Sequence, residues 1–319
     1  MDKAARIFVA GHRGMVGSAL VRELDAHGYR QLVTRTHDEL DLTDQRATTR
    51  FFDEARIDVV LLAAARVGGI LANALEPAKF LYENLAIETN VIHAAYGAGV
   101  KRLVFFGSSC IYPKLCAQPI REEYLLTSAL ETTNEAYAIA KIAGLKMCEA
   151  YNRQYGTRYV SLMPTNLYGP NDNYNLHGSH VLPALIRKAH EARLARAPTL
   201  TVWGTGAPRR EFLHVDDLAA ATRFVLERGV DTGLFNVGVG HDLSIRELAE
   251  RIARIVGYEG KLVFDTSKPD GTPQKLLDVS RLANMGWHAA IDLEEGIGRT
   301  YEEFAARYST DRNHFERMT

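Results

Sequence analysis

An apolar run that ends in a glycine-rich turn and continues as a helix is the feature that most constrains how this chain folds. Ile7–Ala10 has the composition of a buried strand, Gly11–Gly17 follows with the spacing G-x-x-G-x-x-G, and Val16–His27 has a helical pattern. Glycine permits a tight turn, and the N-terminus of a helix offers free N–H groups to a phosphate. This order of strand, turn and helix predicts a parallel sheet that binds a dinucleotide.

The same alternation of strand and helix continues through the first half of the chain. Continuous apolar runs separated by helical patterns are typical of a parallel sheet whose two faces are both covered by helices. We therefore predict an α/β fold built on a doubly wound, Rossmann-like parallel sheet. Its further strands are expected at Gln31–Arg35, Val59–Ala63, Leu103–Phe106 and Tyr159–Met163, and its helices at Thr43–Glu54, Pro77–Gly97 and Asn134–Tyr155.

After Pro164 the alternation becomes irregular, which predicts a smaller α/β domain whose parts are separated in the sequence. Phe212–Arg228 and Leu234–Val237 are expected to return to the main sheet as a helix and a strand. The elements expected in the smaller domain are a helix at His180–Ala197, strands at Leu200–Trp203 and Lys261–Phe264, a loop at Gly204–Arg210, and helices at Ser244–Val256 and from Leu293 onward. We predict a cofactor-binding domain formed by residues 1–165 and about 211–240, and a substrate-binding domain formed by about 166–210 and 241–319.

The overall composition excludes several classes of partner. The 319 residues carry a formal net charge of −1, which gives no general attraction to nucleic acid or anionic membranes. No apolar stretch approaches the roughly 20 residues of a membrane span, and Met1–Arg6 leaves no room for a signal peptide. Cys110, Cys116 and Cys148 have no metal-ligand spacing. We expect a cytoplasmic protein with no metal, nucleic acid or membrane as partner.

Charge near the second predicted strand bears on which dinucleotide is bound. NAD-binding proteins commonly place an acidic residue there against the ribose 2′-hydroxyl. This chain instead has Arg35 at the end of the strand and Arg13 in the glycine loop. Two guanidinium groups favour the 2′-phosphate of NADP. In the alternative interpretation Arg35 points into solvent, and Asp38 or Glu39 binds the ribose.

Ser108, Tyr137 and Lys141 together predict hydride transfer to a carbonyl group. Tyr137 and Lys141 are one turn apart in a predicted helix and share a face, although such a pair is often only structural. Ser108 follows a central strand, where doubly wound folds bind ligands. We expect Tyr137 to be the general acid, Ser108 to donate to the carbonyl oxygen, and Lys141 to lower the pKa of Tyr137. The Cys110 thiol is not needed for this reaction and indicates a second piece of chemistry.

These motifs resemble the extended short-chain dehydrogenase/reductase family that acts on nucleotide sugars, and within it the GDP-L-fucose synthases. The resemblance covers almost the whole chain. It rests on five blocks, Gly11–Gly17, Gly107–Lys114, Pro164–Pro170, Arg210–Asp217 and Lys268–Pro273.

The resemblance implies an activity and a set of roles. GDP-L-fucose synthases epimerise C3 and C5 of GDP-4-keto-6-deoxy-D-mannose and then reduce its C4 ketone with NADPH. Cys110 is implied to be the base of the epimerisation and His180 the acid, and Lys141 is implied to hold the nicotinamide ribose. The implied substrate-binding residues are Lys188, Trp203, Arg210 and Asp270. The implied contacts of NADP(H) are Gly11, His12, Arg13, Gly14, Met15, Val16, Gly17, Arg35, His37, Asp41, Leu42, Lys141, Pro164, Thr165, Asn166, Leu167 and His180.

Further expectations and alternatives follow from the same resemblance. His37 stands where some members have another arginine, so the preference for NADP is expected to be weaker or pH-sensitive. Members are typically homodimers, with Pro77–Gly97 and Asn134–Tyr155 as interface elements. A 4-epimerase or 4-ketoreductase of the same fold would need Ser108, Tyr137 and Lys141 but not the thiol and imidazole. A non-catalytic NADP-sensing protein would need none of the reactive groups.

Overall fold

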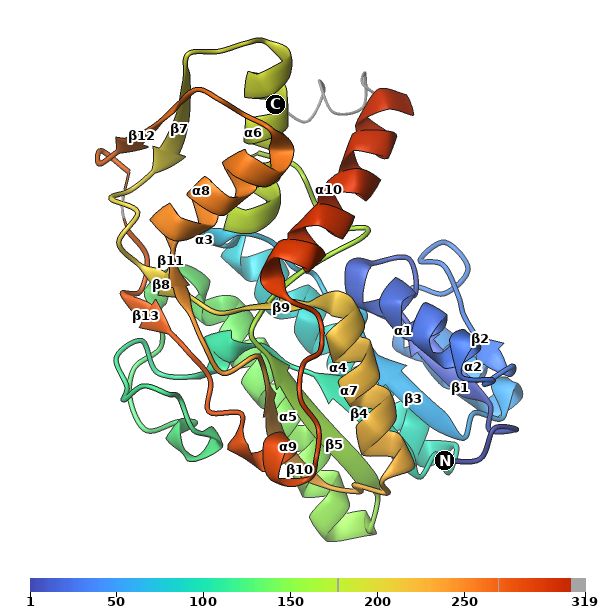
Figure 1. The fold of residues 1–319 in the computed structure, drawn as a ribbon. Helices are drawn as coiled ribbons and strands as arrows, with labels where there is room; N and C mark the ends of the chain where they lie inside the picture. The colour runs from blue at the N-terminus through green and yellow to red at the C-terminus, as the bar shows by residue number, and fades with distance from the viewer. Residues whose placement is uncertain (177, 269, 311–319) are drawn as a thin grey trace.

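The computed structural model describes residues 1–176, 178–268 and 270–310 (Figure 1). Its centre is a six-stranded sheet with the order β10-β5-β4-β3-β1-β2, in which every neighbouring pair of strands is parallel. The predicted doubly wound sheet is therefore confirmed. Its strands are β1 (Ile7–Ala10), β2 (Leu32–Val33), β3 (Val59–Leu62), β4 (Arg102–Phe106), β5 (Arg158–Pro164) and β10 (Gly233–Val237).

Side chains alternate between the two faces of this sheet and form a separate core on each face. Ile7 and Val9 of β1 pack in the core that includes α1 and α7, whereas Phe8 packs in the core that includes α2, α4 and α5. Helices thus cover both faces, as the apolar strands predict. The helices are α1 (Met15–Ala26), α2 (Gln45–Ala55), α4 (Pro77–Gly97), α5 (Glu135–Tyr155) and α7 (Val215–Glu227).

Segments from the second half of the chain form three small sheets and a third core. Leu185, Ile252 and Phe304 are buried in this core, one from each of its three main helices. In Figure 1 these helices, together with β7 and β12, lie above the main sheet. The sheets are β7 (Thr199–Trp203) with β12 (Lys261–Asp265), β6 (Asn166–Tyr168) with β9 (Phe212–His214), and β11 (Leu243–Ser244) with β8 (Arg209–Arg210) and β13 (Gln274–Lys275). The helices are α6 (Val181–Leu194), α8 (Ile245–Val256) and α10 (Leu293–Thr310).

Several element boundaries differ from the sequence-based predictions. The helix predicted at Phe212–Arg228 begins only at Val215, because the first three residues form β9 and pair with β6. The loop predicted at Gly204–Arg210 ends in β8, and the strand predicted at Gln31–Arg35 is reduced to β2. Elements not predicted are the strands β6, β11 and β13, the helices α3 (Ile70–Leu75) and α9 (Ser280–Asn284), and the 3₁₀ helices η1 (Ser109–Ile111), η2 (Glu122–Tyr124) and η3 (Thr132–Asn134). Each of these elements has six residues or fewer, so its sequence shows too little hydrophobic periodicity to be recognised.

Hydropathy along the helices is moderate. Among the described residues, none of the helices combines the length and the apolar composition that a bilayer-spanning segment requires.

Candidate active site and cofactor-binding loop

The glycine loop lies where the strand order reverses, since the chain passes from β1 to β2 on one side and returns to β3 on the other. Gly11 has a φ of +81°, and a Cβ atom there would lie 2.8 Å from the backbone of Ala64, just after β3. A Cβ atom on Gly17 would overlap the carbonyl oxygen of Gly11. Helix α1 then begins after Gly14 with no side-chain cap and no acidic residue in its first turn. The two glycines therefore allow the tight turn and its close packing, and the uncapped N-terminus of α1 offers backbone N–H groups to a pyrophosphate.

Two arginines lie near the end of β2, as expected for the ribose end of a dinucleotide site. Thr36 donates its backbone N–H to Glu39 Oε2 at 2.7 Å. Hydrogen bonds from Thr36, together with the charges of Arg35 and Arg13, lower the pKa of Glu39. Glu39 therefore closes a local turn, and both guanidinium groups lie within electrostatic range of it. The Arg35 guanidinium also lies 5.4 Å from the ring centroid of Phe51.

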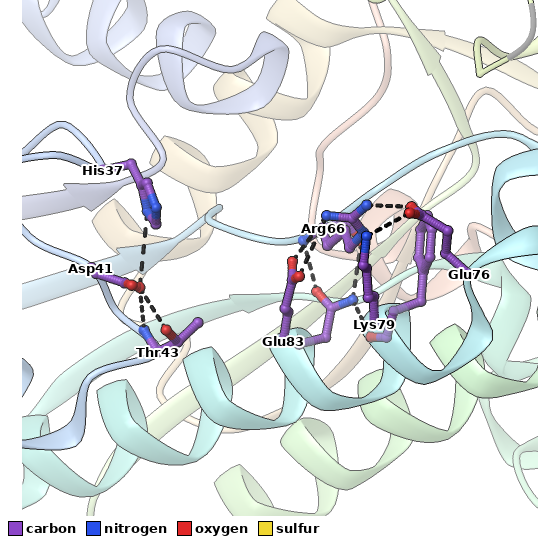
Figure 2. Close-up of polar contacts among 9 residues, drawn as sticks. His37, Asp41, Thr43, Arg66, Glu76, Lys79 and Glu83 are labelled. Atoms are coloured by element: carbon purple, nitrogen blue, oxygen red, sulfur yellow. Dashed lines mark hydrogen bonds and ion pairs between the residues drawn. The ribbon is translucent and has the colours of Figure 1, made fainter.

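His37 and Asp41, which follow Arg35 in the chain, face each other (Figure 2). His37 Nδ1 lies 3.9 Å from Asp41 Oδ1. Asp41 Oδ1 also accepts hydrogen bonds from the backbone N–H and the hydroxyl of Thr43, at 2.9 and 2.7 Å. Burial acts to raise the pKa of Asp41, but the Thr43 hydrogen bonds and His37 lower it overall. Leu42 is buried next to this turn.

The second group in Figure 2, around Arg66, fixes the loop that follows β3. This loop lies against the glycine loop, because Ala64 is packed against Gly11. Arg66 forms ion pairs with Glu76 and with Glu83, the latter at 3.1 Å from Nη1 to Oε2. The backbone N–H of Arg66 donates to Asn84 Oδ1 at 2.9 Å. These contacts join the loop to the first turns of α4. Sequence reasoning did not find Arg66, because its partners lie 10 to 18 residues away.

Ser108, Tyr137 and Lys141 come together at the carboxyl end of β4. Ser108 precedes η1, and its Oγ accepts the backbone N–H of Cys110 at 3.2 Å. Lys141 Nζ lies 5.8 Å from the ring centroid of Tyr137 on the same face of α5. The same Nζ forms a 2.9 Å ion pair with Glu88 Oε1 of α4, and both side chains are buried.

The pKa of Tyr137 is raised, whereas we expected Lys141 to lower it. Burial has the largest effect, and the charges of Cys110 and Glu88 add to it. Glu88 balances the ammonium of Lys141, so the lysine gives little net support to a phenolate. Tyr137 therefore retains its phenolic proton, which is the form that a general acid requires.

Cys110 lies in the same site as Tyr137, since its charge is one of the causes of the raised Tyr137 pKa. Asn134 Nδ2 donates to Cys110 Sγ at 3.1 Å. Lys275 Nζ lies 3.9 Å from the same sulfur. Neither Asn134 nor Lys275 was expected at the site.

His180 ends the loop before α6 and caps that helix only through its backbone. His180 is an exposed residue, although nearby protein atoms cover part of its ring. Partial burial, with a contribution from Lys275, lowers the pKa of His180. Lys275 thus lies within electrostatic range of both His180 and Cys110.

Lys188 and Trp203 form one part of the expected substrate-binding surface. Lys188 Nζ lies 4.7 Å from the ring centroid of Trp203, and burial lowers the pKa of Lys188. Half of the Trp203 surface is exposed, at 50%, so the ring is free to stack on a ligand. Lys268 Nζ approaches the same ring at 5.4 Å.

Arg210 and Asp270 form the other part of the expected substrate-binding surface. Arg210 Nη1 donates to the carbonyl oxygen of Thr272 at 2.6 Å. Burial lowers the pKa of Arg210, while Cys110 and Asp270 act to raise it, so both acidic groups lie within range. Asp270 Oδ2 accepts the hydroxyl of Thr205 at 2.7 Å, which holds it beside Trp203.

The segment Pro164–Leu167 leaves β5 beside these groups and is fixed by Glu211. Thr165 Oγ1 and Asn166 Nδ2 donate to the Glu211 carbonyl oxygen at 3.2 and 2.8 Å. The buried Glu211 carboxylate accepts three backbone N–H groups, including that of Leu277 at 3.0 Å. Burial raises the pKa of Glu211 despite these bonds. Glu211 therefore joins the carboxyl end of the main sheet to the segment that carries Lys275.

The arrangement is that of a dinucleotide-dependent enzyme, with a glycine loop at β1 and reactive groups at β4. The model of the NAD dependent epimerase/dehydratase family matches residues 7–238. The chain therefore belongs to the NAD dependent epimerase/dehydratase family.

Within that family the chain is similar to GDP-L-fucose synthases, which confirms the resemblance that the motifs suggest. It is 58% identical to the GDP-L-fucose synthase of Escherichia coli (strain K12) over 308 residues, which cover 94% of this chain and 96% of that protein. The structure of the GDP-mannoheptose C4 reductase of Campylobacter jejuni with NADP bound is 40% identical, with a TM-score of 0.88 over 96% of this chain and 99% of that chain. The structure of a GDP-L-fucose synthetase from Naegleria fowleri bound to NADP is 28% identical, with a TM-score of 0.89 over 97% and 95%.

Proposed function

We propose that the chain is a GDP-L-fucose synthase, which epimerises C3 and C5 of GDP-4-keto-6-deoxy-D-mannose and then reduces the C4 ketone with NADPH. The observation that carries the proposal is the position of Cys110, whose sulfur receives two N–H donors in the same site as Tyr137. A simple ketoreductase has no use for that sulfur. The 58% identity to the Escherichia coli synthase, against 40% to the reductase, supports the same choice.

NADP(H) fits the residues that would hold it. The uncapped N-terminus of α1 after the glycine loop offers N–H groups to a pyrophosphate, and Arg13 and Arg35 provide two cations for a 2′-phosphate. His37, paired with Asp41, adds charge at this end only when it is protonated. When bound, NADPH supplies the hydride that is added to C4.

The two epimerisations use groups on opposite sides of the sugar ring. Cys110, as a thiolate, takes a proton from C3 or C5, and the electron pair of that C–H bond moves to the C4 oxygen as an enolate. Ser108 and Tyr137 donate hydrogen bonds to this oxygen. His180 then returns a proton to the opposite face of the carbon, and the ketone forms again. The anionic substrate raises the pKa of His180 on binding and so supplies the protonated ring that this step needs.

In the reduction, the C4 oxygen receives the electron pair of the carbonyl bond as the hydride arrives at carbon. Tyr137 donates its phenolic proton to that oxygen, and the phenolate is then reprotonated from solvent. Ser108 stabilises the same developing charge. Lys141, which pairs with Glu88, is proposed to hold the nicotinamide ribose.

The substrate is proposed to lie between the main sheet and the smaller sheets. Arg210 is suited to the diphosphate because its guanidinium is planar and permanently charged. Trp203 offers a stacking surface, Lys188 lies over its ring, and Asp270 accepts a hydrogen bond from the backbone N–H of Thr205, two residues further on. We also propose the two domains as divided above, a homodimer formed through α4 and α5, and a cytoplasmic location, which suits the three free cysteines.

One incubation tests the proposal. The purified chain is mixed with GDP-4-keto-6-deoxy-D-mannose and NADPH in D₂O, and the product is identified by NMR. The expected product is GDP-L-fucose with deuterium at both C3 and C5. A product without deuterium at either carbon would instead assign a 4-ketoreductase, and NADPH binding without its oxidation would assign an NADP-sensing protein.

A further inference from the structure

We propose that Lys275 and Asn134 are positioning residues that hold Cys110 as a thiolate for the two epimerisations and do not serve the reduction. This inference rests on the proposed function, in which Cys110 is the base. A cysteine removes a proton from carbon only as the thiolate, so a group that favours this form controls the first half of the reaction.

Contacts of the residues on both sides of Lys275 fix the strand from which its side chain extends. Lys275 pairs with Arg210 in the parallel ladder between β13 and β8. On one side, Gln274 Nε2 donates to Asp242 Oδ2 at 2.6 Å. On the other side, the backbone N–H of Leu276 donates to Gln118 Oε1 at 2.9 Å. The 3.9 Å separation of Lys275 Nζ from Cys110 Sγ therefore follows from an anchored strand.

The charge of Lys275 is not balanced by a carboxylate, unlike that of other lysines nearby. Lys141 pairs with Glu88 at 2.9 Å, and Lys114, four residues from the cysteine, pairs with Glu131 at 3.1 Å. Lys275 forms no ion pair of this kind within the described ranges. Its positive charge, 3.9 Å from the sulfur, is therefore not offset by such a carboxylate partner.

Asn134 holds the sulfur from the other side. Its Nδ2 donates to Cys110 Sγ at 3.1 Å, and a hydrogen bond to a sulfur acceptor is strongest when the sulfur is ionised. Asn134 Oδ1 is buried and has no hydrogen-bond partner in the part of the chain that the structure describes. Asn134 precedes α5 but makes no side-chain cap to it. The contact with sulfur is thus the one that orients this amide.

Other groups that face Cys110 come from two further elements. Tyr137 of α5 is a neutral phenol, because its pKa is raised. Arg210 of β8 is a cation that remains charged at all relevant pH values and adds to the effect of Lys275. Lys275 also acts on His180, where the ammonium lowers the pKa of the imidazole and favours its neutral form. Arg210 is also the expected ligand of the diphosphate, so its substitution would affect substrate binding. Lys275 is therefore the cation to substitute when the effect on the sulfur is tested.

The first test measures the sulfur without any turnover. The full chain is alkylated with iodoacetamide between pH 6 and 10, and modification of the tryptic peptide 103–114, which contains Cys110 and no other cysteine, is followed by mass spectrometry. Lys275→Met is expected to slow alkylation at neutral pH about tenfold and to move its midpoint to higher pH, because the thiolate loses a nearby opposite charge. Asn134→Ala is expected to slow it less. Lys275→Arg restores the charge and should restore the rate.

A matched control and a second readout separate this role from a structural one. Lys268→Met removes a lysine of the same segment that faces Trp203 instead of the sulfur, and it should leave the alkylation profile unchanged. In turnover, Lys275→Met should slow deuterium exchange at C3 and C5 about tenfold, while the reverse hydride transfer from GDP-L-fucose to NADP⁺ stays within twofold.

The outcomes distinguish the inference from the proposed function. An unchanged alkylation profile in Lys275→Met with a raised KM would assign Lys275 to the diphosphate and overturn the inference. An equal loss of exchange and of hydride transfer would also overturn it. If Lys275→Met slows alkylation as expected but the unsubstituted chain shows no exchange at C3 or C5, the coupling of Lys275 to Cys110 stands and the proposed synthase activity fails.

Discussion

Glu88 lies behind the groups proposed for hydride transfer and balances the charge of one of them. Its carboxylate is buried against Gly144, where a Cβ atom would collide with it, and it faces Lys141 across the contact between α4 and α5. Burial raises the pKa of Glu88, and the charge of Lys141 opposes this. Lys141 can therefore stay charged inside the protein because Glu88 provides its counter-charge.

Removing one partner of this buried pair should destabilise the fold strongly. Glu88→Ala leaves the Lys141 ammonium buried without a counter-charge, which typically costs about 3–5 kcal/mol. Glu149→Ala breaks the exposed pair with Lys146 and should cost about 1 kcal/mol or less. Urea unfolding of the two variants measures the difference. Equal losses would mean that the Glu88 contact contributes no more than a surface pair.

The hydride and epimerisation groups should separate in a second residue-scale experiment. Tyr137→Phe removes the proton donor and should lower NADPH oxidation by a factor of about 100 or more. Deuterium exchange at C3 and C5 should persist at a reduced level, because Ser108 still donates to the enolate oxygen. Cys110→Ala should block exchange first. Turnover of Cys110→Ala at the parental rate would show that another group is the base.

Residues with a local signature were accessible to sequence reasoning, and residues defined by packing were not. Tyr137 and Lys141 are one turn apart, so their shared face follows from helix geometry alone. Glu88, Asn134 and Lys275 reach the site from other segments, and no spacing connects them to Cys110 or Lys141. The pKa of Tyr137 is raised overall because burial, which the spacing along a helix does not reveal, outweighs the effect expected of Lys141.

Among the elements, β1 and α4 have the bounds that the sequence predicted, and α1, which follows the glycine loop, comes close to its predicted bounds. The boundary of α1 differs by one residue at each end, because the loop geometry and the helix pattern agree. By contrast, β9 was predicted as the start of a helix. Its three residues pair with β6, and a pairing across more than 40 residues leaves no local pattern.

Two glycines of the loop, Gly14 and Gly17, should respond differently to replacement by alanine. Gly17→Ala places a Cβ atom on the Gly11 carbonyl oxygen, so the loop must shift and NADPH affinity should fall at least tenfold. A Cβ atom on Gly14 would lie 3.4 Å from the same oxygen, an ordinary contact, and Gly14→Ala should change affinity less than threefold. NADPH fluorescence titration measures both. Similar losses would place the pyrophosphate elsewhere.

Helix α7 is tied to the first segments of the chain by Glu227, and this link should depend on pH. Partial burial acts to raise the pKa of Glu227, but hydrogen bonds from Lys3, Tyr29 and Arg223 lower it to about 2. A carboxyl group with a lowered folded-state pKa stabilises the fold above its unfolded pKa, and this contribution is lost as pH falls toward 2.

Glu227→Gln should therefore cost about 1–2 kcal/mol at pH 7, after allowance for the partial exposure of the site, and little near pH 2. Urea unfolding at several pH values gives the profile. Glu250→Gln, at an exposed position of α8, should show no such dependence. A constant difference between Glu227→Gln and the parent across pH would exclude the ionised carboxylate as its source.

At the scale of the whole molecule, the site is assembled from strand ends of one sheet and from segments that return to it late in the chain. Ser108 and Cys110 follow β4, whereas Arg210 and Lys275 come from β8 and β13. The parallel sheet explains why the early groups converge, since its strands all end at one edge. The late groups are positioned by Glu211, whose carboxylate binds the backbone at Leu277.

The outer faces of α4 and α5 lead to the last prediction, a homodimer in solution. Tyr82 of α4 and Ile139 of α5 are 69% and 45% exposed, although both helices are otherwise packed against the sheet. Ile139 points away from the site, since Lys141 on the same helix is only 2% exposed. Light scattering should give a mass of twice the 35.5 kDa of one chain.

Ile139→Glu should shift this equilibrium toward the monomer. A twofold interface uses the same patch on both subunits, so each substitution enters twice and brings two carboxylates near one another in a desolvated contact. Val263→Glu is the matched control, because Val263 has the same 45% exposure but lies on β12, far from α4 and α5. It should leave the mass unchanged. If both variants remain dimeric, the subunits associate through another face; if the parent is monomeric at micromolar concentration, α4 and α5 form no stable interface.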